Sequence, residues 1–222
     1  MFGAAAWSYQ YNPDSVLSSL TPVRTIRLAL RCKLYLSASY RSLTWYRYGI
    51  RSFDTSAYYG PSEIILGACL KSLEKEFPRP SYKLVCKGRI GALLRAKSGV
   101  QATKCGRYGP DQANFDYSPA TLRASVQRSL TRLNTDYLDA IYLHDVEFVA
   151  APCGPVKAGN HNSALREAKS AYGLAEGDEG KIIGEGDRKI LEAIVELHKM
   201  QEEGLVRAVG ITGKELRSSW MT

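Results

Sequence analysis

The feature that most constrains this chain is an alternation of short apolar runs with amphipathic helical segments. Apolar runs predict strands at 2–7, 50–53, 83–86, 138–143 and 205–211. Hydrophobic residues at helical spacing predict helices between them, at 21–31, 62–77, 118–133 and 187–203. This order of strand and helix implies a parallel sheet whose crossover connections are right-handed.

The expected helix boundaries coincide with capping residues. Thr21-Pro22 and Ser118-Pro119 each place a hydroxyl residue before a proline, a pairing that suits the first turn of a helix. Ser62 is the expected N-cap of the second helix, and Gly204 is the expected C-cap of the last.

Two architectures fit the alternation, a doubly wound open sheet and a (β/α)8 barrel. The first normally carries a G-x-G-x-x-G sequence after its first strand, and no such sequence stands there. The P-loop pattern is also absent from the sequence. We therefore predict an α/β fold of the (β/α)8 TIM-barrel type that is incomplete, with about five of its eight units present.

Composition indicates one globular domain spanning residues 1–222. The hydrophobic fraction of 45% is enough for a sizeable core, and no window approaches the length of a membrane span. The five cysteines form no C-x-x-C pair, which argues against a disulfide framework or a structural zinc site and favours a reducing, cytoplasmic location. We expect no membrane partner and no bound metal.

The net charge of +8 is concentrated in two segments, 32–47 and 86–102, which contain seven basic residues and no acidic one. The rest of the chain is near neutral, so a basic nucleic-acid-binding surface is not favoured. The long glycine-rich stretch 147–186 is expected to cover a site or to serve as a lid.

Ionisable residues stand at the carboxyl ends of the expected strands, where parallel α/β folds place their catalytic groups. Asp54 ends the second strand and Tyr59 follows it closely, a lysine ends the third strand, and His144 ends the fourth. Taken singly, each has an ordinary alternative role, such as a helix cap, a packing aromatic or a backbone hydrogen bond. Compatible residues at consecutive strand ends are less easily explained in this way.

These residue types suit proton transfer to or from a carbonyl or alcohol oxygen. A tyrosine works near neutral pH only if its pKa, normally about 10, is lowered, and a nearby ammonium does this by stabilising the phenolate. An aspartate would orient the lysine, and a histidine would hold the substrate oxygen. The hydride would have to come from a nicotinamide cofactor, because no side chain supplies one.

Several segments resemble the aldo-keto reductases, most closely the D-arabinose dehydrogenase and L-galactose dehydrogenase group. The resemblance runs from about residue 2 to 213 apart from two inserts, and it is carried by 54–60 (DTSAYYG), 103–107 (TKCGR), 138–145 (LDAIYLHD) and 209–212 (VGIT). The opening 2–9 (FGAAAWSY) and the loop 174–180 (LAEGDEG) are also similar to that group.

The resemblance implies a barrel enzyme that uses NAD or NADP to oxidise an aldose to a lactone, or to reduce an aldehyde in reverse. Tyr59 would be the acid/base, Asp54 and the lysine would tune it, and His144 would orient the substrate oxygen. Thr212 would lie close to the nicotinamide amide, and Asp145 would lie one layer further from the substrate. The implied partner is a small sugar or aldehyde.

The resemblance also exposes departures from the family pattern. Segments 32–47 and 86–102 interrupt it as inserts, and the pattern stops after Gly213, so we expect a C-terminally truncated domain. The local motif assigns the catalytic lysine to Lys104, whereas the register of the expected strand assigns it to Lys87. The alternative function is a catalytically inactive barrel fragment or mis-spliced product that acts at most as an interaction protein and self-associates through an unclosed barrel edge.

Overall fold

The strands form a parallel sheet whose spatial order follows the sequence. The computed structural model describes residues 2–31, 52–82, 101–151, 167, 169–173, 175–178 and 180–213. Within these ranges the five-stranded sheet comprises β1 (Phe2–Gly3), β2 (Phe53–Asp54), β3 (Gln101–Cys105), β4 (Ala140–Leu143) and β5 (Val209–Ile211), in the order β1-β2-β3-β4-β5. A doubly wound sheet reverses its strand order partway across, so the sequential order agrees with the predicted barrel type.

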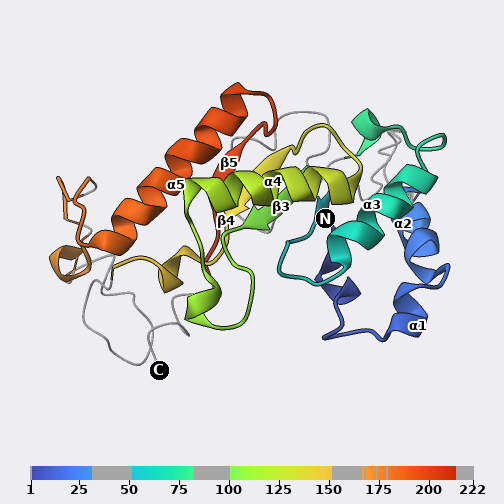
Figure 1. Cartoon of the computed structure of the whole chain (residues 1–222), viewed down its shortest axis with the longest axis horizontal. Helices are drawn as coiled ribbons and strands as arrows, with labels where there is room; N and C mark the ends of the chain where they lie inside the picture. Colours follow the sequence, from blue (N-terminus) through green and yellow to red (C-terminus); the bar gives the residue numbers. More distant parts are fainter. Residues whose placement is uncertain are drawn as a thin grey trace, which may run out of the picture.

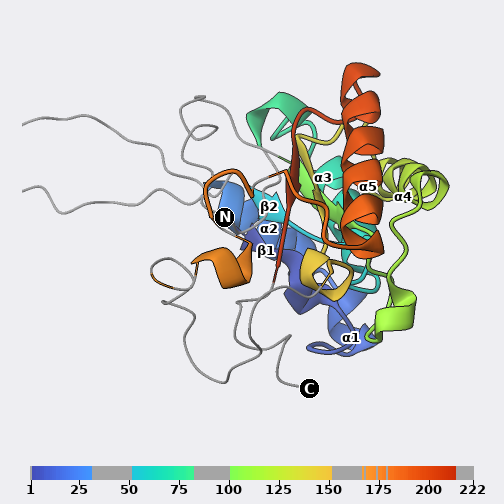
Figure 2. The same ribbon diagram turned by 90° about the vertical axis from the view of Figure 1, so that its left-hand side faces the viewer.

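Helices connect the strands. They are α1 (Asp14–Leu17), α2 (Thr21–Arg31), α3 (Ser62–Ser72), α4 (Pro119–Leu133) and α5 (Glu185–Glu202), with 3-10 turns η1 (Ala4–Trp7), η2 (Arg79–Ser81), η4 (Gln112–Asn114), η5 (Val146–Phe148) and η7 (Lys169–Tyr172). Each helix from α1 to α4 contacts the next one along the chain (Figure 1). The view turned by 90° places α4 and α5 on the same side of the strands (Figure 2). The alternation predicted from the sequence is confirmed as an α/β fold.

Helix α4 shows how the sequence sets a helix. Pro119 occupies the first turn, where its missing N–H costs nothing, and Ser118 takes the N-cap position without a side-chain hydrogen bond. Leu122 and Val126 recur at helical spacing and are completely buried. The helix ends at Asn134, which adopts a left-handed conformation with φ 52°. The predicted helix at 118–133 is therefore confirmed to within one residue.

Two expectations about the N-terminal half are wrong in detail. The apolar run 2–7 is a strand only at Phe2–Gly3 and continues as η1. Ser62 does not cap α3, because its buried hydroxyl donates to the Ala4 carbonyl at 2.8 Å and lies 2.9 Å from the Thr55 hydroxyl. Pro61 occupies the N-cap position instead. The serine ties the start of α3 to the ends of β1 and β2.

The third strand is β3, which begins later in the sequence than expected. Its register pairs Ala102 with Asp54 of β2 and Lys104 with Tyr142 of β4. The first two residues of β3 fall inside the predicted insert 86–102. The expected strand 83–86, Lys87, the insert 32–47 and the tail after Gly213 lie outside the described residues.

The close crossing of α3 and α4 depends on Gly67. A Cβ atom added there would lie 2.0 Å from the Arg132 carbonyl oxygen and 2.7 Å from the Leu133 Cα, both of which are backbone atoms. Alanine would favour the helical backbone, but the clash can be relieved only by moving the helices apart. We expect Gly67→Ala to lower the free energy of unfolding by about 2 kcal/mol, as measured by urea denaturation.

Gly180→Ala is the matched control, because nothing lies within 4 Å of a Cβ added at Gly180. An unchanged stability of Gly67→Ala would mean that α3 and α4 do not pack as closely as described.

No helix in the described ranges is both long enough and apolar enough to cross a bilayer. The same residues contain no group of three or more His, Cys, Asp or Glu side chains arranged to hold a metal ion.

Candidate active site

The residues predicted from strand ends meet at one edge of the sheet. Asp54 is the last residue of β2, Lys104 is the second-last residue of β3, and His144 directly follows β4. Tyr59 stands in the loop between β2 and α3. Parallel strands bring their carboxyl ends to the same edge, and the structure brings all four side chains into one cluster.

Lys104 is the centre of this cluster. Its side chain is 4% exposed, and Nζ lies 2.7 Å from Asp54 Oδ1 and donates to the Thr55 carbonyl at 2.8 Å. Side chains alternate along a strand, so neighbouring Thr103 points to the opposite face, where it donates to Glu63 at 2.6 Å. A buried ammonium is tolerated only with partners of this kind. Asp54 and Thr55 therefore fix the position of Nζ.

Tyr59 lies between Lys104 and His144. The Lys104 ammonium is 4.7 Å from the centroid of the Tyr59 ring. The His144 ring meets Tyr59 edge-on, at 6.0 Å between centroids and 88° between planes. A tight turn positions the tyrosine, since its N–H donates to the Ser56 carbonyl at 3.0 Å and the following Gly60 has φ +55°.

The neighbouring Tyr58 is equally close to His144, with 6.1 Å between ring centroids. The cation next to Tyr58 is Arg107 and not Lys104, since the guanidinium carbon of Arg107 lies 4.4 Å from the centroid of the Tyr58 ring. Arg107 is held by a carboxylate of its own, Asp145. The two adjacent tyrosines are therefore distinguished by their surroundings, and Tyr59 is the one beside the lysine.

His144 is fixed through its backbone and its ring. Its N–H donates to the Cys105 carbonyl at 3.0 Å, and the Tyr117 hydroxyl donates to its carbonyl at 2.8 Å. Ser56 Oγ lies 3.2 Å from Nδ1 of the ring. Burial raises the pKa of Tyr117, so this tyrosine braces the backbone and is unsuited to proton transfer near neutral pH.

Thr212 directly follows β5 at the same edge. Its hydroxyl accepts the Asp145 N–H at 3.2 Å, and its own N–H donates to the Leu143 carbonyl at 2.8 Å. These bonds join the ends of β4 and β5 next to His144.

Between the two lysines considered from the sequence, the geometry favours Lys104. It pairs with Asp54 and faces Tyr59, as the motif assignment required. Lys87 lies outside the described residues. The register argument for Lys87 rested on the expected strand 83–86, which also lies outside the described residues, whereas Lys104 belongs to β3 (Gln101–Cys105).

Sequence reasoning gave no role to Arg107 or Ser56. Arg107 is 7% exposed and forms an ion pair with Asp145 at 2.5 Å. Both residues stand inside the motifs 103–107 and 54–60, a few positions beyond a strand end. Their positions in these motifs were visible in the sequence, but their partners lie on other strands and were not.

The buried cysteines of the described residues, Cys69 and Cys105, are expected to be unreactive. Burial raises the pKa of Cys69 to about 11 and raises that of Cys105 as well. At pH 8 roughly one Cys69 in a thousand would be the nucleophilic thiolate. Peptide mapping after iodoacetamide treatment should find both unmodified in native protein and modified in urea. Rapid labelling of Cys105 in folded protein would contradict its burial beside Lys104.

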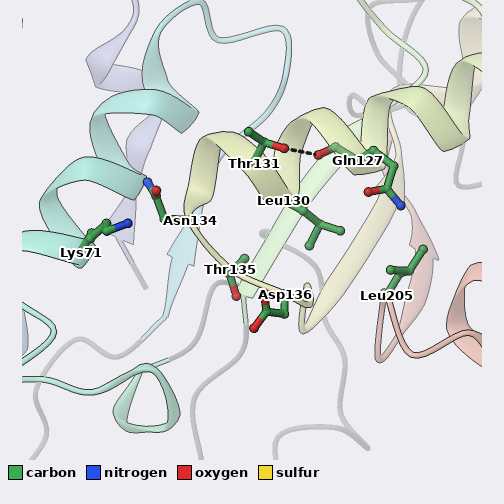
Figure 3. Close-up of a pocket in the computed structure, with 8 residues that line it drawn as sticks. All are labelled: Lys71, Gln127, Leu130, Thr131, Asn134, Thr135, Asp136 and Leu205. Carbon is green, nitrogen blue, oxygen red and sulfur yellow. Dashed lines mark hydrogen bonds between the residues drawn. The ribbon is translucent and has the colours of Figure 1, made fainter.

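A separate cavity of about 520 Å³ lies away from this cluster (Figure 3). It is lined by α3 and α4 side chains, by the turn Asn134–Asp136 before β4, and by Leu205 before β5. These segments precede their strands, whereas the clustered side chains follow theirs. The cavity therefore lies at the amino end of the sheet and does not contribute to the site.

Comparison with known proteins decides the family. A model described as the aldo/keto reductase family matches residues 42–219. The chain belongs to the aldo/keto reductase family.

Two curated relatives illustrate the position of this chain within the aldo/keto reductases. D-arabinose 1-dehydrogenase of Saccharomyces cerevisiae is 34% identical over 76% of this chain and 34% of its own length. L-galactose dehydrogenase of Arabidopsis thaliana is 33% identical over 77% of this chain and 36% of its own length. The chain spans about a third of the length of these relatives. A solved aldo-keto reductase structure from Pseudomonas aeruginosa is similar to this chain at 22% identity and a TM-score of 0.49. The match covers 96% of this chain and 54% of the Pseudomonas chain.

Proposed function

We propose that this aldo/keto reductase chain contributes the proton-transfer site of an NAD(P)-dependent oxidoreductase that oxidises an aldose at C1 to its lactone, or reduces an aldehyde in the opposite direction. The single observation that carries the proposal is the placement of Lys104, paired with Asp54 and lying over the Tyr59 ring opposite His144. The names of the curated relatives support an aldose such as D-arabinose or L-galactose as the substrate.

Tyr59 would exchange the proton. In the oxidative direction its phenolate accepts the proton of the C1 hydroxyl while the C1–H hydrogen leaves as hydride toward the nicotinamide position. In the reductive direction its phenol donates a proton to the carbonyl oxygen as the hydride is added at C1. The Lys104 ammonium stabilises the phenolate, and Asp54 keeps the ammonium in place. Both steps need the tyrosine oxygen and the substrate oxygen to be held together.

His144 would orient that oxygen. Its ring stands edge-on to Tyr59 and is anchored at Nδ1 by Ser56, so Nε2 is the nitrogen that would donate toward the substrate. An imidazole held by Ser56 at Nδ1 and packed against the Tyr58 and Tyr59 rings presents its donor in one direction, which favours one pose of the reacting carbon.

The described residues fit the nicotinamide end of a dinucleotide. Thr212 stands at the same edge as the proton-transfer residues, and its hydroxyl accepts the Asp145 N–H at 3.2 Å and makes only a long 3.4 Å bond to the Leu143 carbonyl, which supports an exchange of that bond for a carboxamide oxygen. Bound NAD or NADP would supply or accept the hydride. Thr212 would lie against the amide, and the tyrosine, lysine and histidine would act on the substrate oxygen.

The proposal is tested with the purified chain, D-arabinose or L-galactose, and NAD or NADP, by following the absorbance of the reduced nicotinamide. Turnover that depends on both aldose and cofactor is expected. No turnover with any of the four combinations, from protein whose circular dichroism and thermal unfolding show a folded chain, would favour the inactive fragment.

A further inference from the structure

A buried ion pair lies directly behind the candidate substrate-orienting histidine. Arg107 and Asp145 are 7% and 6% exposed, and Arg107 Nη1 lies 2.5 Å from Asp145 Oδ2. The same Oδ2 atom is 3.6 Å from His144 Nε2. One carboxylate oxygen therefore lies close to both a permanent cation and the imidazole nitrogen that the proposed reaction uses.

The surroundings of Arg107 hold its guanidinium in one place. Nε donates to the Gly109 carbonyl at 3.1 Å. The guanidinium carbon also lies 4.4 Å from the ring centroid of Tyr58, 5.3 Å from that of Phe115 and 5.7 Å from that of Phe148. An arginine enclosed by aromatic faces is a fixed cation, and a lysine could not reproduce its planar contacts.

The backbone of Asp145 is also fixed by its surroundings. It has φ 57° and ψ 59°, a left-handed conformation that is uncommon for residues other than glycine, asparagine and aspartate. Its N–H donates to the Thr212 hydroxyl at 3.2 Å. Backbone strain of this kind persists where the surroundings determine it, and it is common at functional sites.

The hydrogen bonds around the ring indicate which nitrogen carries the proton. Ser56 Oγ accepts the Tyr58 N–H at 3.2 Å, so its own hydrogen can point to His144 Nδ1, also at 3.2 Å. A neutral ring that accepts at Nδ1 carries its proton on Nε2, which at 3.6 Å from Asp145 Oδ2 is near this carboxylate but beyond hydrogen-bond distance from it. An uncompensated carboxylate at that position would attract the proton and favour a charged imidazolium.

We propose that Arg107 is a positioning residue that pairs with Asp145 and so prevents this carboxylate from stabilising the charged imidazolium form of His144. The ring then remains neutral and directed at the substrate oxygen. This inference deepens the proposed function and rests on it for the role of His144, but the protonation of the ring can be measured without turnover.

The groups that face the imidazole from each neighbouring element define the test. Tyr58 and Tyr59 approach from the loop after β2, Asp145 from the loop after β4, and Ser56 contacts Nδ1. Lys104 lies beyond Tyr59, and Arg107 lies beyond Asp145 and Tyr58. Arg107→Met removes one cation from this set and leaves the other groups in place.

The experiment is a ring-nitrogen NMR titration of the full chain. The sequence contains three histidines, so a His144→Gln sample suffices to assign the signal. We expect the His144 ring to stay charged to higher pH in Arg107→Met than in the unsubstituted chain. In Arg107→Met combined with Asp145→Asn, the titration should return to that of the unsubstituted chain, because asparagine tolerates the left-handed backbone but carries no charge. An unchanged titration in Arg107→Met, or no reversal in the double variant, overturns the inference.

Activity and stability provide the remaining readouts. Arg107→Met should lower kcat by about 10- to 100-fold, and the double variant should recover part of that loss. Arg123→Met is the matched control. Arg123 lies on α4 and also pairs with carboxylates, Glu196 of α5 and Glu203 directly after it, away from the site. If Arg107→Met does not fold, Arg107→Gln is a second neutral replacement with the same expected titration. A shifted titration in a chain that shows no turnover would uphold the inference and reject the proposed function.

Discussion

Replacing Tyr59 with phenylalanine is expected to lower kcat by a factor on the order of 10²–10⁴ while leaving the fold intact, because a general acid/base contributes about that much. Phenylalanine keeps the ring that contacts Lys104 and His144 and removes only the oxygen that we propose exchanges the proton. The measurement is the initial rate of nicotinamide reduction at saturating aldose. The KM for the aldose should change much less than kcat.

Tyr58→Phe is the matched control for this prediction. Tyr58 is the adjacent residue and is 6.1 Å from the same histidine, but its cation is Arg107 and not Lys104. The Tyr58 variant should retain most of its activity. If the two substitutions had equal effects, or if Tyr58→Phe had the larger one, the assignment of the proton to the tyrosine beside Lys104 would be wrong.

Replacing Lys104 with methionine is the second large effect that we expect. The substitution removes the ammonium that we propose stabilises the phenolate. It also leaves the Asp54 carboxylate, whose side chain is 13% exposed, without its Lys104 partner. Breaking a buried pair from one side is costly, so the free energy of unfolding should fall by about 3 kcal/mol. The rate of aldose oxidation should fall at least as far as in Tyr59→Phe.

Lys104→Met with Asp54→Asn separates the two effects. The double variant no longer contains the unpaired carboxylate, so it should recover stability without recovering activity. Urea denaturation and the nicotinamide assay on the same samples make the comparison. Recovery of activity in the double variant would show that Lys104 acts by supporting the fold and not by stabilising the phenolate.

The sequence predicted a helix correctly where the spacing of its hydrophobic residues and its capping residues agreed. The helix from Pro119 to Leu133 has both, and its end at Asn134 is visible in the sequence. The strand between β2 and β4 is Gln101–Cys105, which the hydrophobic runs did not predict and which is identified by its pairing with both neighbours. Ser62 has the composition of a cap, but a tertiary contact with Ala4 uses its hydroxyl.

The candidate site was predictable to the extent that strand ends in parallel sheets converge. This rule was sufficient to predict that Asp54, Tyr59 and His144 lie close together. It could not choose between Lys87 and Lys104, because that choice depends on strand register. It also could not reveal that Arg107 and Asp145 form a pair, since the two are 38 positions apart and meet only when β3 and β4 align.

The measurement that tests the central claim most directly is isotope transfer. The chain is incubated with NAD or NADP and an aldose deuterated at C1, and the reduced cofactor is examined by mass spectrometry. The account predicts deuterium on the nicotinamide with the unsubstituted chain and with Tyr58→Phe, and a rate of deuterium transfer lower by a factor on the order of 10²–10⁴ with Tyr59→Phe. Absence of deuterium with the folded, unsubstituted chain, or equal transfer in the Tyr59 variant, would contradict it.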